Sequence, residues 1–180
     1  AIQQKIMTTE KLHFKTSSGI KSIVGKDLIT DKFVAIFELV KNSYDAGAKQ
    51  VTITFDKDKI IIVDDGHGMS KNDLVEKWLN LAYSEKKEGS LSNKERIYVG
   101  SKGIGRFSAD RLGSKLTITT KVKDENLQHI VRIDWNKFDE DLKTLFEDVY
   151  LDYEESRLFD LNVESYTKIE ICSLHDKWSK

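Results

Sequence analysis

The spacing of apolar residues along the chain predicts three helices. Between Leu28 and Tyr44 the apolar positions recur every three or four residues, and Gly47 supplies an end for this helix. A second helix is predicted to begin at Ser70, a common N-cap residue type that is followed by Asp73 three positions later. The three predicted helices cover residues 28–44, 71–81 and 104–112.

Two other patterns predict strands. Residues 51–55 alternate between apolar and polar side chains, whereas residues 60–63 are all apolar, so the charged residues between them predict a hairpin turn. Later strands are predicted at residues 115–122, 127–135 and 166–172. The acidic stretch from residue 136 to residue 164 follows neither pattern.

Length and charge limit the class of protein. We expect one domain over residues 27–180, preceded by an N-terminal segment, residues 1–26, that includes a strand-like run and is interpreted as partly tag or linker. The 29 basic and 30 acidic residues nearly cancel, which gives no general attraction to nucleic acid or to an anionic membrane. No apolar run approaches the roughly 20 residues that span a bilayer, and no secretory signal opens the chain, so a cytoplasmic location without membrane contact is expected.

The first predicted helix carries a stripe of hydrogen-bonding side chains. Asn42 and Asp45 follow Glu38 by four and seven positions, which places them about 40° and 20° from Glu38 around a helix. Charged residues are mostly exposed, so a stripe of this kind alone is most often a solvated helix face. A functional interpretation needs support from elsewhere in the chain.

A turn rich in Asp and Gly follows the apolar strand at 60–63. Its sequence is Asp64-Asp65-Gly66-His67-Gly68, and these are ordinary turn residues. However, carboxylates at the end of a buried strand are costly unless they have partners, and Gly lets a backbone approach a ligand closely. A carboxylate there can accept a hydrogen bond from an exocyclic amino group, which would distinguish adenine from guanine.

A second Gly-rich segment leads into the third predicted helix. In Gly100-Ser-Lys-Gly103-Ile-Gly105, free backbone N–H groups and the positive end of the helix could hold phosphates, although a flexible turn is the simpler alternative. The segment has neither the G-K-[ST] of a Walker A loop nor the position of a dinucleotide fingerprint. The polar residues at about 84–99, which precede it, are interpreted as a lid.

Together, in this order, the three motifs resemble the N, G1 and G2 boxes of the GHKL ATPase superfamily, which includes gyrase B, the ninety-kilodalton heat-shock chaperone, histidine kinases and MutL. The phrase from Glu38 to Gly47 is especially similar to MutL-type proteins, and that from Gly103 to Ala109 to the chaperone and MORC-like branches. The resemblance implies a Bergerat fold. That fold is an α/β (α+β) two-layer sandwich, in which helices cover one face of a mixed, mostly antiparallel sheet.

The resemblance also implies roles for single residues. Glu38 would be the general base that activates water, Asn42 would hold Mg²⁺, and Asp64 would bind the adenine amino group. Thr167 matches the G3-box Thr that supports this Asp. The other positions that the resemblance places against ATP are Asp45, Gly66, Gly68, Met69, Gly100, Lys102, Gly103, Ile104 and Gly105.

We expect an Mg²⁺-dependent ATPase, because histidine kinases typically lack a base at the position of Glu38 and no helix with a phospho-acceptor His is evident. The alternatives are a histidine-kinase-type catalytic domain and a non-hydrolysing, nucleotide-gated binding module. Related ATPases receive a Lys or Arg from a following domain, so slow turnover is expected of this domain alone. ATP, a nucleotide-dependent homodimer and downstream domains are the expected partners, and any contact with nucleic acid would be made through those domains.

Overall fold

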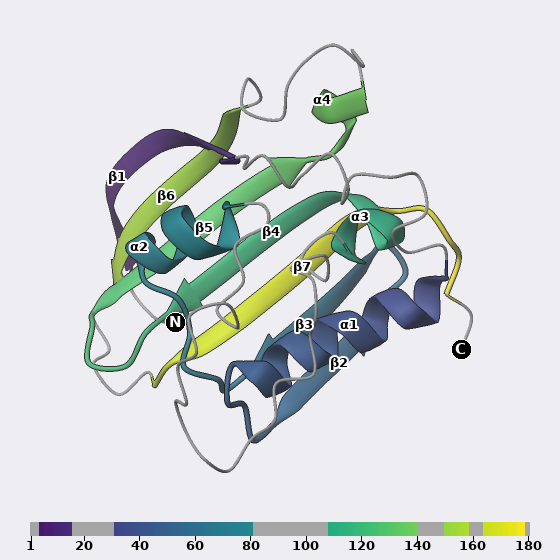
Figure 1. Cartoon of the computed structure of the whole chain (residues 1–180), viewed down its shortest axis with the longest axis horizontal. Coiled ribbons are helices and arrows are strands. Elements are labelled where there is room, and N and C mark those ends of the chain that lie inside the picture. Colours follow the sequence, from purple (N-terminus) through teal and green to yellow (C-terminus); the bar gives the residue numbers. More distant parts are fainter. Residues whose placement is uncertain (1–3, 16–30, 81–107, 140–149, 159–163, 179–180) are drawn as a thin grey trace.

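The computed structural model describes residues 4–15, 31–80, 108–139, 150–158 and 164–178, and these build one seven-stranded sheet (Figure 1). The strand order is β1-β6-β5-β4-β7-β3-β2, and every neighbouring pair of strands is antiparallel. The strands are β1 (Gln4–His13), β2 (Val51–Phe55), β3 (Lys59–Asp64), β4 (Gly113–Lys121), β5 (Leu127–Asp134), β6 (Tyr150–Leu158) and β7 (Tyr166–Leu174).

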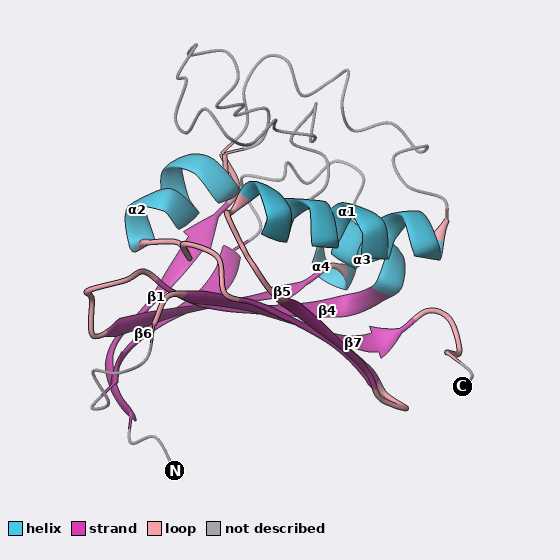
Figure 2. Cartoon of the chain, turned by 90° about the horizontal axis from the view of Figure 1, so that it is seen from below, coloured by secondary structure: helices cyan, strands magenta, loops and turns pink. Residues whose placement is uncertain are grey.

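The described helices lie on one face of this sheet (Figure 2). They are α1 (Lys32–Asp45), α2 (Lys71–Asp73), the π-helical turn η2 (Leu74–Trp78), α3 (Ser108–Leu112) and α4 (Asn136–Asp139). The predicted two-layer α/β sandwich with a mostly antiparallel sheet is therefore confirmed. Among the described helices, none is both long and apolar enough to cross a membrane.

Side-chain caps fix where two helices begin. The carboxylate of Asp31 accepts hydrogen bonds from the backbone N–H groups of Phe33 at 2.7 Å and Val34 at 3.0 Å, so α1 begins at Lys32. Ser70 and Asp73 form the reciprocal capping box that the sequence predicts at the start of α2. The second predicted helix is only partly correct, because the chain widens into η2 after one turn instead of continuing as an α-helix.

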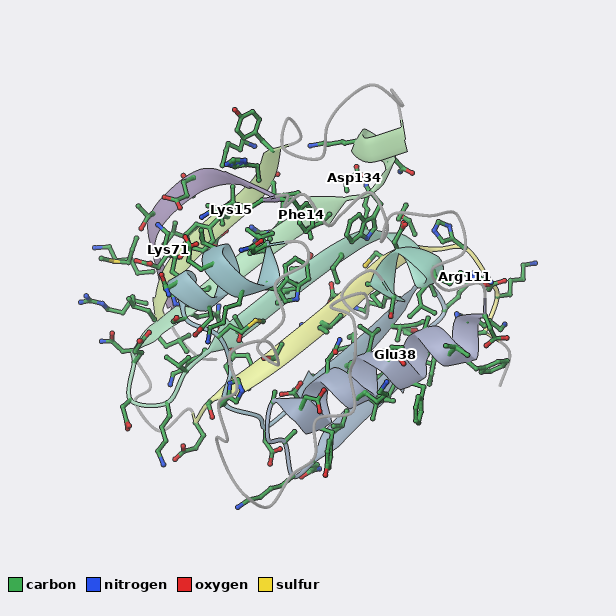
Figure 3. All side chains as sticks on the ribbon, viewed as in Figure 1. Phe14, Lys15, Glu38, Lys71, Arg111 and Asp134 are labelled. Carbon is green, nitrogen blue, oxygen red and sulfur yellow. The ribbon has the colours of Figure 1, made fainter. Side chains whose placement is uncertain are left out.

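The hydrophobic core fills the space between the helices and the sheet. Phe14, which directly follows β1, is fully buried, and its ring centroid lies 6.0 Å from that of Trp78 and 6.1 Å from that of Trp135 (Figure 3). Inward-facing residues of β3, β4, β5, β6 and β7 complete this core: Ile60, Ile62, Leu116, Ile118, Val131, Ile133, Leu151, Tyr153 and Ile171. The core thus couples the first strand of the chain to the helix layer.

Two features of the sheet were not predicted. The acidic stretch contains β6, in which buried Leu151 and Tyr153 alternate with exposed Asp152. β6 pairs with β5 on one side and with β1 on the other, so the N-terminal strand forms one edge of the sheet.

The described part of the third predicted helix is α3, and Gly113 begins β4 directly.

Candidate functional site

The carboxylate of Asp64 is the most buried acidic group at the polar end of β3. Asp64 is only 5% exposed, and its Oδ2 accepts a 2.7 Å hydrogen bond from the hydroxyl of Ser43 on α1. Its Oδ1 accepts a 3.0 Å hydrogen bond from the backbone N–H of Gly66. Burial raises the pKa of Asp64, although the hydrogen bonds from Ser43 and Gly66 oppose this effect. Because a carboxylate accepts about four hydrogen bonds, Asp64 keeps capacity for a donor on a ligand.

The neighbouring Asp65 has a different role. It is exposed, and its Oδ1 accepts backbone hydrogen bonds from Lys49 at 2.7 Å and Gln50 at 2.8 Å. These bonds, first that from Gln50, lower the pKa of Asp65. The two adjacent carboxylates are thus divided: Asp65 ties the end of β3 to the segment after α1, and Asp64 faces the core.

The turn that follows is held close to backbone on two sides. His67 donates its backbone N–H to Ala46 O at 2.9 Å, and a Cβ atom at Gly66 would lie 2.8 Å from the same oxygen. Gly68 has a φ of +68°, and a Cβ atom there would lie 1.9 Å from Lys121 O. Only Gly fits at position 68, because its positive φ and the nearby backbone of Lys121 leave no place for a side chain.

A pair of threonines lies beside this turn. Thr167 of β7 is directly opposite Asp64 in β3 and is 8% exposed. On its other side it pairs with Thr120 of β4, and the two hydroxyl oxygens are 3.1 Å apart. Thr120 Oγ1 also accepts a 2.9 Å hydrogen bond from the backbone N–H of Met69. The structure therefore brings together Asp64, Thr167 and the Gly68-Met69 turn.

The polar stripe of α1 flanks the helix face that packs on the sheet. Leu39 and Ser43 are buried, whereas Glu38 and Asp45 are partly exposed and Asn42 is exposed. Glu38, labelled midway along α1 in Figure 3, accepts a 2.8 Å hydrogen bond from Lys41 through its Oε1. No described contact joins Glu38 or Asn42 to Asp64; the contact between α1 and Asp64 is made by Ser43.

Several predicted site residues lie outside the described residues. They are the phosphate-loop positions Gly100, Lys102, Gly103, Ile104 and Gly105, together with the lid at about 84–99. Within the described ranges, no group of three or more His, Cys, Asp or Glu side chains is arranged to hold a metal ion. A metal there would need ligand atoms from a bound molecule or from residues of other types.

Ser43 and Thr120 were missed by the sequence analysis. Each is a hydroxyl residue at a position where the local pattern expects an apolar side chain: Ser43 follows Leu39 by four residues on the buried face of α1, and Thr120 follows Ile118 by two in β4. A search for polar residues at core positions would have found both. Such residues need buried partners. Here Ser43 donates to Asp64, and Thr120 contacts Met69 and Thr167, so the partners belong to the candidate site.

Comparison with known proteins points in the same direction as this geometry. A family described as histidine kinase-, DNA gyrase B- and HSP90-like ATPase matches residues 30–167. The chaperone protein HtpG of Rickettsia massiliae is 30% identical over 151 residues, and that of Rickettsia typhi is 30% identical over 146 residues. These matches cover 69% and 67% of this chain and 24% of each relative.

A DNA mismatch repair protein is also similar. MutL of Pseudothermotoga lettingae is 30% identical over 123 residues, covering 64% of this chain and 21% of that protein. The chain thus spans about a quarter of the length of the curated relatives it matches. The family match covers the helix with Glu38, the turn after Asp64 and the strand position of Thr167. This chain belongs to the histidine kinase-, DNA gyrase B- and HSP90-like family of ATPases, the GHKL superfamily.

Proposed function

We propose that this domain binds ATP with its adenine amino group on Asp64 and hydrolyses it with the help of Mg²⁺. The observation that carries the proposal is the buried Asp64 carboxylate, which Ser43 and Gly66 hold in place while it keeps capacity to accept from a ligand. A buried carboxylate would discriminate strongly between a base that presents an amino group and one that presents a carbonyl.

Asn42 is the proposed magnesium ligand. Its side chain is exposed one helical turn after Glu38, and it offers a neutral amide oxygen, a ligand type that fits Mg²⁺. Magnesium in nucleotide sites is bound by few protein groups and by substrate phosphates and water. A site with one amide ligand on α1 fits a metal that arrives with ATP.

Glu38 is the proposed general base. Lys41 engages Oε1 of this carboxylate at 2.8 Å, and the second oxygen of the group can accept a hydrogen bond from water. Asp45 is proposed to lie near the nucleotide on the same stripe. Two further parts of the proposal rest on the sequence alone. They are a phosphate loop at 100–105, with Lys102, and a lid at about 84–99.

Calorimetric titration tests the base site first. Wild-type protein should bind ATP in the presence of magnesium and bind GTP at least tenfold more weakly, whereas Asp64→Asn should lose most of its ATP affinity. Asp58→Asn, in the exposed turn between β2 and β3, is the matched control and should bind like the wild type. Equal binding of ATP and GTP, or unchanged affinity of Asp64→Asn, would reject the assignment of Asp64.

Phosphate release tests the chemistry. Glu38→Gln keeps the shape of the side chain and should lower the hydrolysis rate about 100-fold or more while ATP binding persists. Asn42→Ala should weaken the magnesium dependence of ATP binding. If labelled phosphate is transferred to the histidine of an added phospho-acceptor domain in place of being released, the histidine-kinase alternative is correct; ATP binding with neither release nor transfer supports the nucleotide-gated binding module.

Conformational coupling completes the proposal. A non-hydrolysable ATP analogue should protect residues 84–99 from protease if the lid closes over the nucleotide. An unchanged cleavage pattern would contradict lid closure. Light scattering in saturating analogue tests the proposed homodimer. Since this chain matches about a quarter of a chaperone and about a fifth of a DNA mismatch repair protein, we propose that further domains of a longer protein use this ATP cycle.

A further inference from the structure

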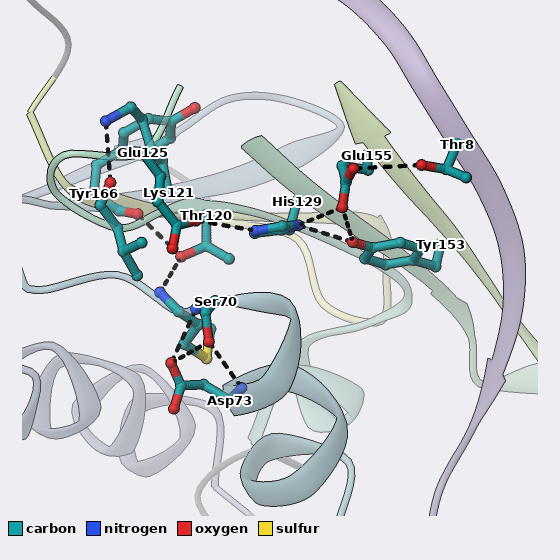
Figure 4. Close-up of polar contacts among 12 residues, drawn as sticks. Thr8, Ser70, Asp73, Thr120, Lys121, Glu125, His129, Tyr153, Glu155 and Tyr166 are labelled. Atoms are coloured by element: carbon teal, nitrogen blue, oxygen red, sulfur yellow. Dashed lines mark hydrogen bonds and ion pairs between the residues drawn. The ribbon is translucent and has the colours of Figure 1, made fainter. Parts of the chain in front are cut away.

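A row of polar side chains crosses the helix-covered face of the sheet from Asp64 to β1. Each member lies opposite the next on a neighbouring strand: Asp64 of β3, Thr167 of β7, Thr120 of β4, His129 of β5, Glu155 of β6 and Thr8 of β1. The next inward-facing level of the four central strands is instead hydrophobic or aromatic: Ile118, Val131, Tyr153 and Ile169. Figure 4 shows the contacts along much of this row.

Thr120 is the residue of the row that touches the proposed base site from two directions. It is fully buried. Its Oγ1 accepts from the backbone N–H of Met69 at 2.9 Å, lies 3.1 Å from Tyr166 O, and lies 3.1 Å from the hydroxyl oxygen of Thr167. Three partners surround this hydroxyl group, which has only one proton to donate, so the direction of each hydrogen bond can be assigned.

Counting protons gives a direction to each bond. A hydroxyl has one donor and two acceptor sites, and the Met69 N–H can only donate. The carbonyl of Tyr166 can only accept, so Thr120 donates its proton there. Thr167 must then donate to Thr120, which leaves the acceptor sites of the Thr167 hydroxyl for the site beside Asp64.

We propose that Thr120 is a positioning residue that sets both the Gly68-Met69 turn and the hydroxyl orientation of Thr167 for recognition of an amino-bearing base. This inference rests on the proposed function of Asp64. It adds a residue in the second strand away from Asp64 and assigns the proton of Thr167.

The loss of the Thr120 hydroxyl has a specific consequence for Asp64. Residues directly opposite on antiparallel strands have Cβ atoms about 4.5–5.5 Å apart, so a Thr167 hydroxyl released from Thr120 can turn toward the Asp64 carboxylate. It would then donate to the acceptor that the amino group of the base needs. The Met69 N–H would also lose its buried acceptor, which loosens the turn.

The test compares three variants of β4 by calorimetry with ATP and GTP. Thr120→Val keeps the shape but removes the hydroxyl; it should bind ATP about tenfold more weakly and prefer ATP over GTP less than the wild type does. Thr120→Ser retains the hydroxyl and should restore both properties. Thr119→Val, on the opposite face of the same strand, is the matched control and should bind like the wild type.

Failure of this inference differs from failure of the proposed function. If Asp64→Asn loses ATP while folded Thr120→Val binds ATP and GTP like the wild type, the inference is wrong and the base site stands. If the wild type binds no ATP, or if Asp64→Asn binds ATP as tightly as the wild type does, the proposed function fails, and the role of Thr120 in base selection fails with it.

Amide hydrogen exchange in the ligand-free protein tests the turn independently of ATP. The Met69 N–H should be protected in the wild type and in Thr120→Ser, and should exchange at least tenfold faster in Thr120→Val, with amides of the β4–β5 core unchanged as the control for folding. Equal protection of Met69 in the wild type and Thr120→Val would overturn the positioning role.

Discussion

The hydroxyl of Ser43 donates a 2.7 Å hydrogen bond to Oδ2 of Asp64 and thereby joins α1 to the end of β3. Both side chains are almost fully buried, Ser43 at 2% exposure and Asp64 at 5%. The helix that carries Glu38 and Asn42 is therefore positioned against the strand that carries the proposed adenine ligand by a contact inside the site. A change at Asp64, the proposed adenine ligand, should therefore be transmitted through α1 to Glu38 and Asn42, which are proposed to act at the phosphates.

Ser43→Ala should weaken both the fold and ATP binding. The substitution leaves a buried carboxylate with one donor fewer, which costs about 1–3 kcal/mol in unfolding free energy. Urea denaturation measures this cost, and calorimetry measures the loss of affinity. Ser173→Ala, an exposed serine at the end of β7, is the control. Wild-type stability in Ser43→Ala would show that the Ser43–Asp64 bond does not hold α1 in place.

Asp64→Asn should maintain or raise the stability of the ligand-free protein at pH 7 while it weakens ATP binding. The Asn oxygen can still accept from Gly66, its amide can donate to Ser43, and Ser43 can donate to Leu39 O at 3.4 Å. Because the raised pKa of Asp64 means that burying its charge costs free energy, the substitution removes this cost.

The sign of the pH dependence follows from the same shift. The native state takes up a proton at Asp64 at a higher pH than the unfolded state does, so the wild type gains stability as pH falls through the native pKa. Asp64→Asn lacks this gain. Its advantage in urea midpoint over the wild type should therefore be greatest near pH 7 and shrink toward pH 4; an advantage that grows on acidification would contradict the buried-charge explanation.

The sequence predicted elements whose signals are local. The β2–β3 hairpin followed from alternation in one strand and an apolar run in the next, and the capping box at Ser70 followed from residue types three positions apart. β6 was missed because its inward Glu155 breaks the alternation that Leu151 and Tyr153 begin; only pairing with β5 and with the distant β1 defines it. A π-helical turn such as η2 cannot be separated from an α-helix by apolar spacing over so few residues.

The candidate site shows the same division. Asp64 and the glycines after it could be predicted because Asp and Gly beside an apolar strand are unusual in combination. Ser43 and Thr120 stand at positions where the local pattern expects apolar side chains, but their roles could not be assigned from the sequence, because their partners Asp64 and Met69 lie 21 and 51 positions away, respectively. The resemblance supplied roles for the motif residues but none for these two.

Gly68→Ala should unfold or severely destabilise the protein, and Gly47→Ala provides the comparison. Both glycines have positive φ values, +68° and +76°, so Ala is strained by about 1–2 kcal/mol at either position. At Gly47 no atom lies within 4 Å of an added Cβ, whereas at Gly68 the added atom would lie 1.9 Å from Lys121 O. The clash should bring the cost at Gly68 to at least about 3 kcal/mol. Similar urea midpoints for the two variants would show that the turn can move away from β4.

Protonation of His129 should destabilise the fold below neutral pH. The side chain is 3% exposed, and its Nδ1 lies 2.8 Å from the hydroxyl oxygen of Tyr153. Burial lowers the pKa of His129, while Glu155 and Glu125, each 3.9 Å away, oppose the shift and Lys71 adds to it. The unfolded state therefore binds the proton first as pH falls from about 6.5, and stability present above that pH is lost down to the native pKa.

Replacing this histidine isolates its contribution. Between pH 7.5 and 5.5 the wild type should lose more unfolding free energy than His129→Gln does, by up to about 1.4 kcal/mol for each pH unit within the titration window. His13→Gln, at an exposed position on β1, is the control substitution. Urea midpoints at the two pH values measure the difference, and because Asp64 is unchanged in both variants its opposite pH dependence cancels. If His129→Gln and the wild type lose equal stability, the charges of Glu155 and Glu125 compensate the burial of His129, and the polar row tolerates a cation at its centre.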